Sequence, residues 1–271
     1  MDGNSLQENL LPEVSLPSGK TETVPSKNRR AGRPRKGTAA RRRGELLELP
    51  HDAEGRLTFE RAFWREAPGA ILAGVDEAGR GCLAGPVVAG AVSIDAEVLE
   101  MLASGELAPV NDSKQLTPKK RDELFEIMTH RPEIRWAVGM ASAAEIDRIN
   151  ILRATHLAMR RAVEGLPVLP ARALVDGLPV KGLPVPHDAI VKGDARSLLI
   201  ACASIVAKVT RDRLCVSMDA QYPGYGFAAH KAYGTKAHLK ALKALGPCSE
   251  HRRSFAPVLQ VLADDTLPGL L

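Results

Sequence analysis

The stretch AILAGVDEAGRGCLAGPVVAGAVSI, residues 70–94, decides the fold. It holds two apolar runs, AILAGV and GPVVAGAVSI, on either side of a glycine-rich turn. Each run has the length of a buried strand, and a third run, IRWAVGM, alternates Ile134, Trp136 and Val138 on one face. Three strands in close succession with short connections predict an antiparallel meander.

Helical patterns surround these strands. The fold class that they predict is α/β, with a mixed sheet flanked by helices. Another strand, RALVDG, ends on Asp176. The expected helices are FERAFWRE capped by Thr58, a helix opened by the capping box of Ser142 and Glu145 and ended by Gly165, a long helix from Ala195 to about Met218, and a short one from Thr235 to Leu245 closed by Gly246.

The composition points to one soluble, cytoplasmic protein. With 271 residues and 45% hydrophobic content, the chain is long enough for one substantial core. Its longest apolar run, Leu198–Ala207, is far shorter than the ~18 residues of a membrane helix. The four cysteines form no CxxC pair, which favours reduced thiols, and the flanking His230 and His238 lack companion ligands for zinc.

The positive charge belongs to an N-terminal tail. Lys27–Arg43 holds nine basic residues and no acidic one, so a net charge of +5 leaves −4 on the rest of the chain. We expect a disordered tail over 1–44, a linker over 45–57, a catalytic domain over 58–258 and a C-terminal tail over 259–271. AGRPRKG, Ala31–Gly37, resembles an AT-hook for A/T-rich minor grooves. General phosphate attraction and a solvated tail without a partner are the alternatives. QENLL, Gln7–Leu11, loosely resembles a sliding-clamp peptide.

The glycine-rich turn does not indicate a nucleotide-binding fold. Gly79, Gly81 and Gly85 give GxGxxxG, and the next segment is strand-like rather than the start of a helix. No GK[ST] follows, which excludes a P-loop.

Carboxylates lie instead at the ends of apolar elements. Asp76 and Glu77 end one strand, Asp176 ends another, and Asp194 precedes the long helix. Any one of them is explained by a turn or a helix cap. Neighbouring strand residues point to opposite faces, so Glu77 must lie where the strand becomes a turn if it shares a site with Asp76. Four converging carboxylates would balance two divalent ions, Mg²⁺ or Mn²⁺, about 4 Å apart at a phosphodiester.

One stripe of the long helix is small and cationic. This stripe is expected to line a groove that binds an anion, with Ser204 and Lys208 as candidate substrate-binding residues. The stripe consists of Asp194, Ser197, Ala201, Ser204, Lys208 and Arg211.

Taken together, these motifs resemble the bacterial ribonuclease HII family over roughly residues 58–258. The resemblance rests on GVDEAGRG (74–81), NDSKQLT (111–117), LVDG (174–177), IACASIVAKVTRDR (200–213), HKAYGTKAH (230–238) and HRRSFAPV (251–258). It implies an RNase H-like fold and metal-dependent cleavage of RNA in RNA–DNA hybrids. It also implies incision beside single ribonucleotides in duplex DNA. We expect the protein to act as a monomer.

The resemblance also implies roles for single residues. Asp76, Glu77, Asp176 and Asp194 would be the catalytic, metal-binding acids. Gly79, Arg80 and Gly81 would approach the sugar-phosphate and read the ribose 2′-hydroxyl, and Tyr233 would pack by the following deoxyribose. Asp112, Ser113 and Lys114, with Lys208, would hold the nucleic-acid backbone, although capping is an alternative for the first pair. Cys82 and Ala232 depart from the family, which often has proline and glycine there.

Two other functions are compatible with parts of the sequence. Ribonuclease HIII, which favours longer RNA stretches, is disfavoured by Asp194, by Tyr233 and by the polar N-terminal extension. A non-catalytic DNA-binding protein that uses the basic tail is disfavoured because all four acids are present.

Overall fold

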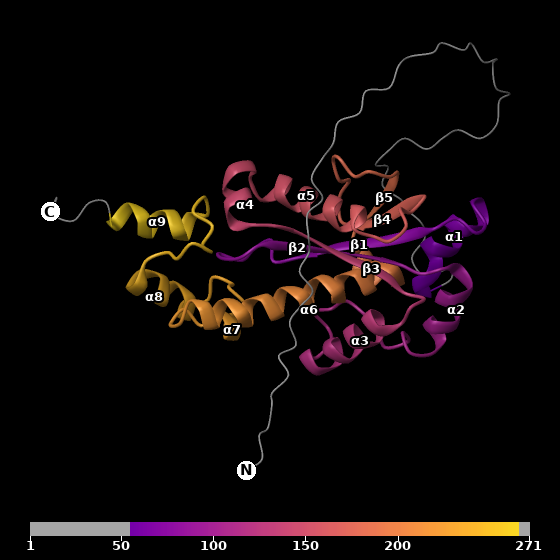
Figure 1. Ribbon diagram of the computed structural model, residues 1–271, viewed down its shortest axis with the longest axis horizontal. Coiled ribbons are helices and arrows are strands. Elements are labelled where there is room, and N and C mark those ends of the chain that lie inside the picture. Colours follow the sequence, from indigo (N-terminus) through magenta and orange to yellow (C-terminus); the bar gives the residue numbers. More distant parts are fainter. Residues whose placement is uncertain (1–54, 266–271) are drawn as a thin grey trace, which may run out of the picture. The chain divides into compact units, whose positions relative to one another are not determined.

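A five-stranded sheet, in the order β3-β2-β1-β4-β5, organises the computed structural model, which describes residues 55–265 (Figure 1). The antiparallel part contains β1 (Leu72–Ala78), β2 (Val87–Ser93) and β3 (Arg135–Ala141). In its register Asp76 is opposite Gly90, and Gly90 is opposite Val138. The predicted meander and the α/β class are confirmed.

Two parallel strands extend the sheet beyond β1. β4 (Arg172–Asp176) pairs parallel with β1, and β5 (His187–Ile190) pairs parallel with β4. Because the carboxyl ends of parallel strands lie at one edge of a sheet, Asp76 and Asp176 come to the same edge. The apolar patterns do not predict β5, whose four residues include a histidine and an aspartate.

Helices cover both faces of the sheet. α6 (Leu198–Gln221) packs on β1 and β2 from one side, and α5 (Ile151–Glu164) packs on β2 and β3 from the other (Figure 1). Glycine permits each close approach: a Cβ at Gly74 would lie 2.2 Å from the Leu199 carbonyl carbon, and one at Gly139 would lie 2.1 Å from the Ala158 carbonyl oxygen. β1, which carries Asp76, is therefore pressed directly on the start of α6.

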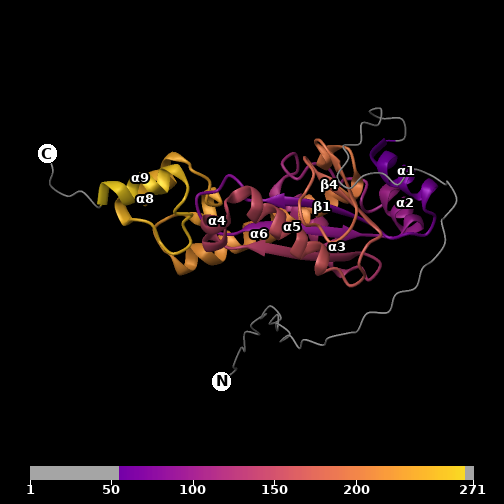
Figure 2. The same cartoon turned by 90° about the horizontal axis from the view of Figure 1, so that it is seen from above.

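The remaining helices lie around the sheet and beyond its ends. Both views place α8 and α9 at the end opposite α1 and α2 (Figure 2). No helix among the described residues is long and apolar enough to cross a membrane. These helices are α1 (Thr58–Glu66), α2 (Ala96–Ser104), α3 (Pro118–His130), α4 (Ala143–Ile149), α7 (Phe227–His230), α8 (Lys236–Leu245) and α9 (Ala256–Asp265), with a 3₁₀ turn, η1, at Gly55–Leu57.

Two helix boundaries agree with the sequence patterns and three do not. The Ser142 capping box and the Thr235 cap with Gly246 are present. Thr58 does not cap α1, because its hydroxyl donates backwards to the Gly55 carbonyl. The helix expected to run to Gly165 is broken at Asn150, which has a φ of 66° and caps α5.

The start of the long helix also differs from the prediction. Asp194 lies in a separate 3₁₀ turn, η2 (Gly193–Ala195), and Ser197 caps α6 by accepting from the Ile200 amide. Asp194 is thus not the cap of this helix. The basic tail, the AT-hook-like segment and Gln7–Leu11 lie outside the described residues.

Candidate active site

Three carboxylates from separate elements meet at the edge of the sheet. Asp76 comes from the end of β1, Asp176 from the end of β4, and Asp194 from η2. One oxygen from each lies within 4.8 Å of the others. Among residues 55–265 this is the group of His, Cys, Asp and Glu side chains that has the spacing of a metal site.

Backbone amides fix the orientation of these acids. Asp176 Oδ1 accepts from the Gly193 amide at 2.6 Å, which ties the end of β4 to the turn that carries Asp194. Asp76 Oδ1 accepts from the Glu77 amide at 2.7 Å. The carboxylates of Asp76 and Asp176 are therefore held in place by the local backbone before any cation binds.

The cluster is electrostatically costly without a cation. Burial, followed by the charges of Glu77 and Asp176, holds the pKa of Asp76 well above its usual range. Burial and the charge of Asp194 also raise the pKa of Asp176. Hard divalent ions such as Mg²⁺ and Mn²⁺ prefer carboxylate oxygens, so the donor set fits them.

Lys114 supplies a positive charge at one side of the cluster. Its Nζ lies 3.3 Å from Asp194 Oδ2 and 3.9 Å from Asp112 Oδ1, while the Asp112 carboxylate accepts from the Lys114 amide at 2.9 Å. Burial opposes the charge, but the two carboxylates outweigh it and raise the pKa of Lys114. The predicted Asp112, Ser113 and Lys114 segment does lie beside the acids, with Ser113 buried.

Glu77 stands apart from the group of three. It is still within β1, its Oε1 lies 3.4 Å from Arg80 Nη1, and it is not a member of the cluster defined by the 4.8 Å spacing. Burial raises its pKa, against the opposing charge of Arg80. Glu77 nevertheless lies close to two of these acids. Its charge raises the pKa of Asp76, and the charge of Asp176 raises the pKa of Glu77.

The glycine turn after β1 has two different glycines. Gly79 has a φ of 89°, and a Cβ there would lie 2.8 Å from Arg211 Nε, so the fold itself requires glycine. Gly81 has neither constraint: it is exposed, and its Cβ would meet nothing within 4 Å. The bare backbone at Gly81 is therefore available to a ligand rather than demanded by packing.

Tyr233 faces this turn across a narrow cleft. Gly79, Cys82, Lys208 and Tyr233 are among the residues lining it, and Cys82 pairs with Tyr233 in an isolated antiparallel bridge. The Tyr233 side chain is 46% exposed. Ala232 has a φ of 61°, a conformation that favours glycine, which explains why an alanine here is an unusual choice.

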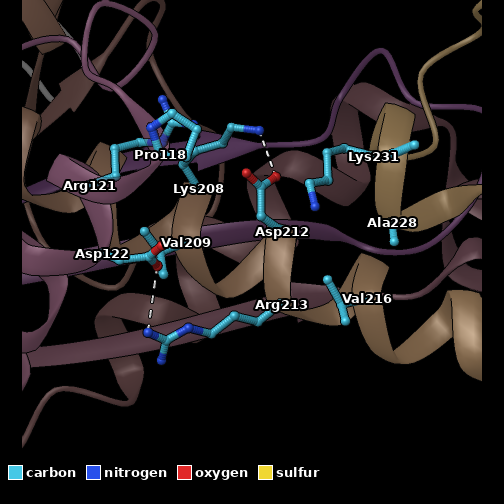
Figure 3. Close-up of a pocket in the computed structure, with 11 residues that line it drawn as sticks. Pro118, Arg121, Asp122, Lys208, Val209, Asp212, Arg213, Val216, Ala228 and Lys231 are labelled. Carbon is cyan, nitrogen blue, oxygen red and sulfur yellow. Dashed lines mark hydrogen bonds and ion pairs between the residues drawn. The ribbon is translucent and has the colours of Figure 1, made fainter.

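Lys208 also borders a larger groove of about 450 Å³ between α3, α6 and α7 (Figure 3). Lys208 Nζ donates to Asp212 Oδ1 at 2.6 Å, and the two side chains, both lining the groove, point toward one another. Ser204, predicted to contact substrate, is instead buried, and its hydroxyl donates to the Ala201 carbonyl.

The stripe predicted to line a groove is largely buried, because Ser197, Ala201, Ser204 and Arg211 are each at most 3% exposed. Arg211 is only 2% exposed and points inward, where its guanidinium donates to the carbonyls of Pro86 and Ala84. Arg252, to which the sequence motifs assign no role, is fully buried and donates to the carbonyls of Gly79, Arg80 and Gly85. The available signal was its place in HRRSFAPV.

An antiparallel meander extended by parallel strands, with carboxylates at the shared strand edge and helices on both faces, defines an RNase H-like α/β protein. The ribonuclease H2 of Pyrococcus horikoshii has this architecture, with a TM-score of 0.62 and 28% identity over 73% of this chain and all of that chain. The ribonuclease HII of Archaeoglobus fulgidus, solved as a complex with PCNA, has a TM-score of 0.53 and 27% sequence identity. The match covers 68% of this chain and 95% of that chain.

The chain belongs to the ribonuclease HII family. The model of that family matches residues 73–258. Ribonuclease HII 1 of Methylibium petroleiphilum is 53% identical over 193 residues, which cover 71% of this chain and 93% of that protein. The family cleaves RNA in RNA–DNA hybrids by hydrolysing phosphodiester bonds, and the suspected resemblance is confirmed.

Proposed function

We propose that this protein is a divalent-metal-dependent endonuclease that also incises duplex DNA 5′ to a single embedded ribonucleotide, leaving a 3′-hydroxyl and a 5′-phosphate. The observation that carries the proposal is the meeting of Asp76, Asp176 and Asp194 within 4.8 Å. Burial, together with repulsion from neighbouring carboxylates, raises the pKa values of Asp76 and Asp176, and a bound cation would relieve this cost. We place this activity in a monomeric, cytoplasmic enzyme.

The acids would hold Mg²⁺ or Mn²⁺, with Glu77 as the fourth ligand residue. When bound, such ions supply Lewis-acid stabilisation of the charge that develops on the phosphodiester. The hydrogen bond from the Gly193 amide keeps the Asp176 carboxylate aligned. Lys114, 77% exposed at its side chain, would contact a backbone phosphate beside the acids.

Recognition of the ribonucleotide is assigned to the turn and the tyrosine. The exposed backbone of Gly81 would approach the ribose, whose 2′-hydroxyl distinguishes RNA from DNA. Arg80 would bind phosphate, and Tyr233 would pack against the following deoxyribose across the cleft. Lys208, Asp112 and Ser113 are proposed to position the nucleic-acid backbone.

The test uses Asp76→Asn and Asp194→Asn, assayed on a duplex with one embedded ribonucleotide in Mg²⁺ and in Mn²⁺. Each variant should lose more than about a hundredfold in cleavage rate, because even groups that only orient metal ligands are worth 10–100-fold. Asp264→Asn, at an exposed site on α9, is the matched control. Cleavage at the wild-type rate by either active-site variant would refute the metal assignment.

Two further partners are proposed for the N-terminal residues outside the described range. Ala31–Gly37 would bind DNA as an AT-hook or by general phosphate attraction, and Gln7–Leu11 would contact a sliding clamp. The PCNA complex of the Archaeoglobus relative supports the second proposal.

A further inference from the structure

One short C-terminal segment contacts both elements proposed to read the substrate. We define the reading turn as Gly79–Gly81, the tyrosine loop as Lys231–Gly234, and the brace as Cys248–Arg252. The Arg252 amide donates to the Leu83 carbonyl at 2.8 Å, so the brace runs alongside the chain that leaves the reading turn. The Leu83 amide in turn donates to the Ala232 carbonyl at 2.8 Å, which joins the turn to the tyrosine loop.

The Arg252 guanidinium fixes the reading turn. Nη2 donates to the Gly79 carbonyl at 2.7 Å, Nη1 to the Arg80 carbonyl at 2.8 Å, and Nε to the Gly85 carbonyl at 2.9 Å. The side chain is fully buried, and no ion pair of Arg252 is found within residues 55–265. A buried cation is costly unless its donors are satisfied, so these carbonyls and Arg252 hold each other in place.

A pair of buried histidines fixes the tyrosine loop. His251 Nδ1 accepts from the Cys248 amide at 3.1 Å, so its proton lies on Nε2, which is 3.1 Å from His238 Nε2. His238 Nδ1 must then carry its own proton, and it donates to the Tyr233 carbonyl at 3.0 Å. The two backbone partners thus determine both tautomers, and the chain of hydrogen bonds ends at the residue that flanks the cleft.

We propose that His251 and Arg252 are positioning residues that set the separation between the reading turn and Tyr233, and thereby the selectivity for a ribonucleotide. Neither side chain belongs to the acid cluster; each acts through the backbone of a reading element. Adjacent residues on one segment hold both walls of the cleft, so a shift of one wall is transmitted to the other. The inference rests on the function proposed above, because it takes the turn and Tyr233 as the ribose-reading elements.

Arg252→Lys tests the proposal, since lysine keeps the charge but cannot reach three carbonyls in a fixed fork. The kinetic measurements are kcat and KM on a duplex with one ribonucleotide, and the inhibition constant of the same duplex made entirely of DNA. The ratio of this inhibition constant to KM reports selectivity for the ribose. The variant should lower this ratio about tenfold, the size of one misaligned hydrogen bond, with kcat and the half-saturating Mn²⁺ concentration unchanged.

Arg253→Lys is the matched control, because Arg253 is the exposed neighbour of Arg252 and its backbone amide donates to Asp147 Oδ2 rather than to the turn. A purely structural role would lower Tm and the active fraction but leave the selectivity ratio at its wild-type value, and that result would overturn the proposal. If the wild-type protein itself fails to cut at a single ribonucleotide, the proposed function fails, which is a distinct outcome.

His251→Gln tests the same proposal at the tyrosine loop. It is the deciding variant if Arg252→Lys does not fold. Glutamine loses the acceptor for the Cys248 amide while retaining a donor toward His238, so selectivity should again fall. If neither variant folds, hydrogen exchange of the wild-type Leu83 and Arg252 amides decides. Protection lost together in one opening event supports the brace, whereas independent opening overturns it.

Discussion

The difference in unfolding free energy between Glu60→Gln and the wild type should shift in favour of the variant as the pH rises. Glu60 lies on α1 with no exposed surface, and its Oε1 accepts from the Ser197 hydroxyl at 2.6 Å and the Leu199 amide at 3.0 Å. Its Oε2 is buried without a hydrogen-bond partner in residues 55–265. Burial raises the pKa of Glu60 from 4.5 to about 7, although these hydrogen bonds oppose the rise.

The sign follows from the proton count. Between pH 4.5 and about 7 the folded chain keeps a proton that the unfolded chain has released, so stability falls as pH rises through this window and is level above it. A shift of about 2.5 pKa units at 1.36 kcal/mol each corresponds to about 3 kcal/mol. Glutamine does not titrate, so the variant escapes this loss.

Urea unfolding at pH 5 and pH 8 measures the effect. The free energy of unfolding of Glu60→Gln, minus that of the wild type, should increase by about 2–3 kcal/mol from pH 5 to pH 8. Glu66→Gln, at the exposed end of the same helix, is the control and should show no such change. An equal difference at both pH values, or a larger one at pH 5, would refute the reasoning.

Three other perturbations have defined outcomes. Gly74→Ala should cost at least about 3 kcal/mol of unfolding free energy in urea, because its Cβ would lie 2.2 Å from the Leu199 backbone, whereas Gly81→Ala should leave stability within about 0.5 kcal/mol. Arg172→Met should cost about 3 kcal/mol in the same assay, because Arg172 lies 2.9 Å from the buried Asp188 carboxylate. Deleting residues 1–44 should weaken duplex binding and flatten its salt dependence between 50 and 200 mM, with the cleavage position unchanged.

The strands of the fold were predictable where apolar residues form runs or alternate. β1, β2 and β3 are bounded by turns, and β4 is buried along its middle, so local pattern and tertiary environment agree. β5 was not predictable in this way, because His187 and Asp188 are buried through specific partners: His187 Nε2 accepts from the Val180 amide, and Asp188 pairs with Arg172.

Helix boundaries failed where local chemistry has more than one solution. Asp194 and Ser197 can each cap a helix, and the fold uses Ser197 because Asp194 lies in η2, which the Gly193 amide ties to Asp176. Asn150 was hidden inside a continuous helical pattern, yet it adopts a positive φ and caps α5 itself. Asparagine tolerates that conformation better than most residues, but nothing in the periodicity reveals it.

The acids of the site were predictable from their positions at element ends, because a parallel pairing of β1 and β4 brings such ends together. The exact membership was not. Alternation along β1 turns neighbouring side chains to different faces, and Glu77 remains inside the strand, paired with Arg80 rather than grouped with the three aspartates. Of the four predicted acids, the three aspartates therefore form one cluster, and Glu77 lies beside it.

The arginines show the limit of sequence reasoning more sharply. Arg80, Arg211 and Arg252 all occur in motifs on which the family resemblance rests, but of these three only Arg80 is exposed. Arg211 and Arg252 instead donate to backbone carbonyls in residues 79–86. Two buried cations therefore stabilise the glycine turn and the segment that follows it. A glycine turn cannot hold its own shape through side-chain packing, and distant guanidinium groups supply what its glycines lack.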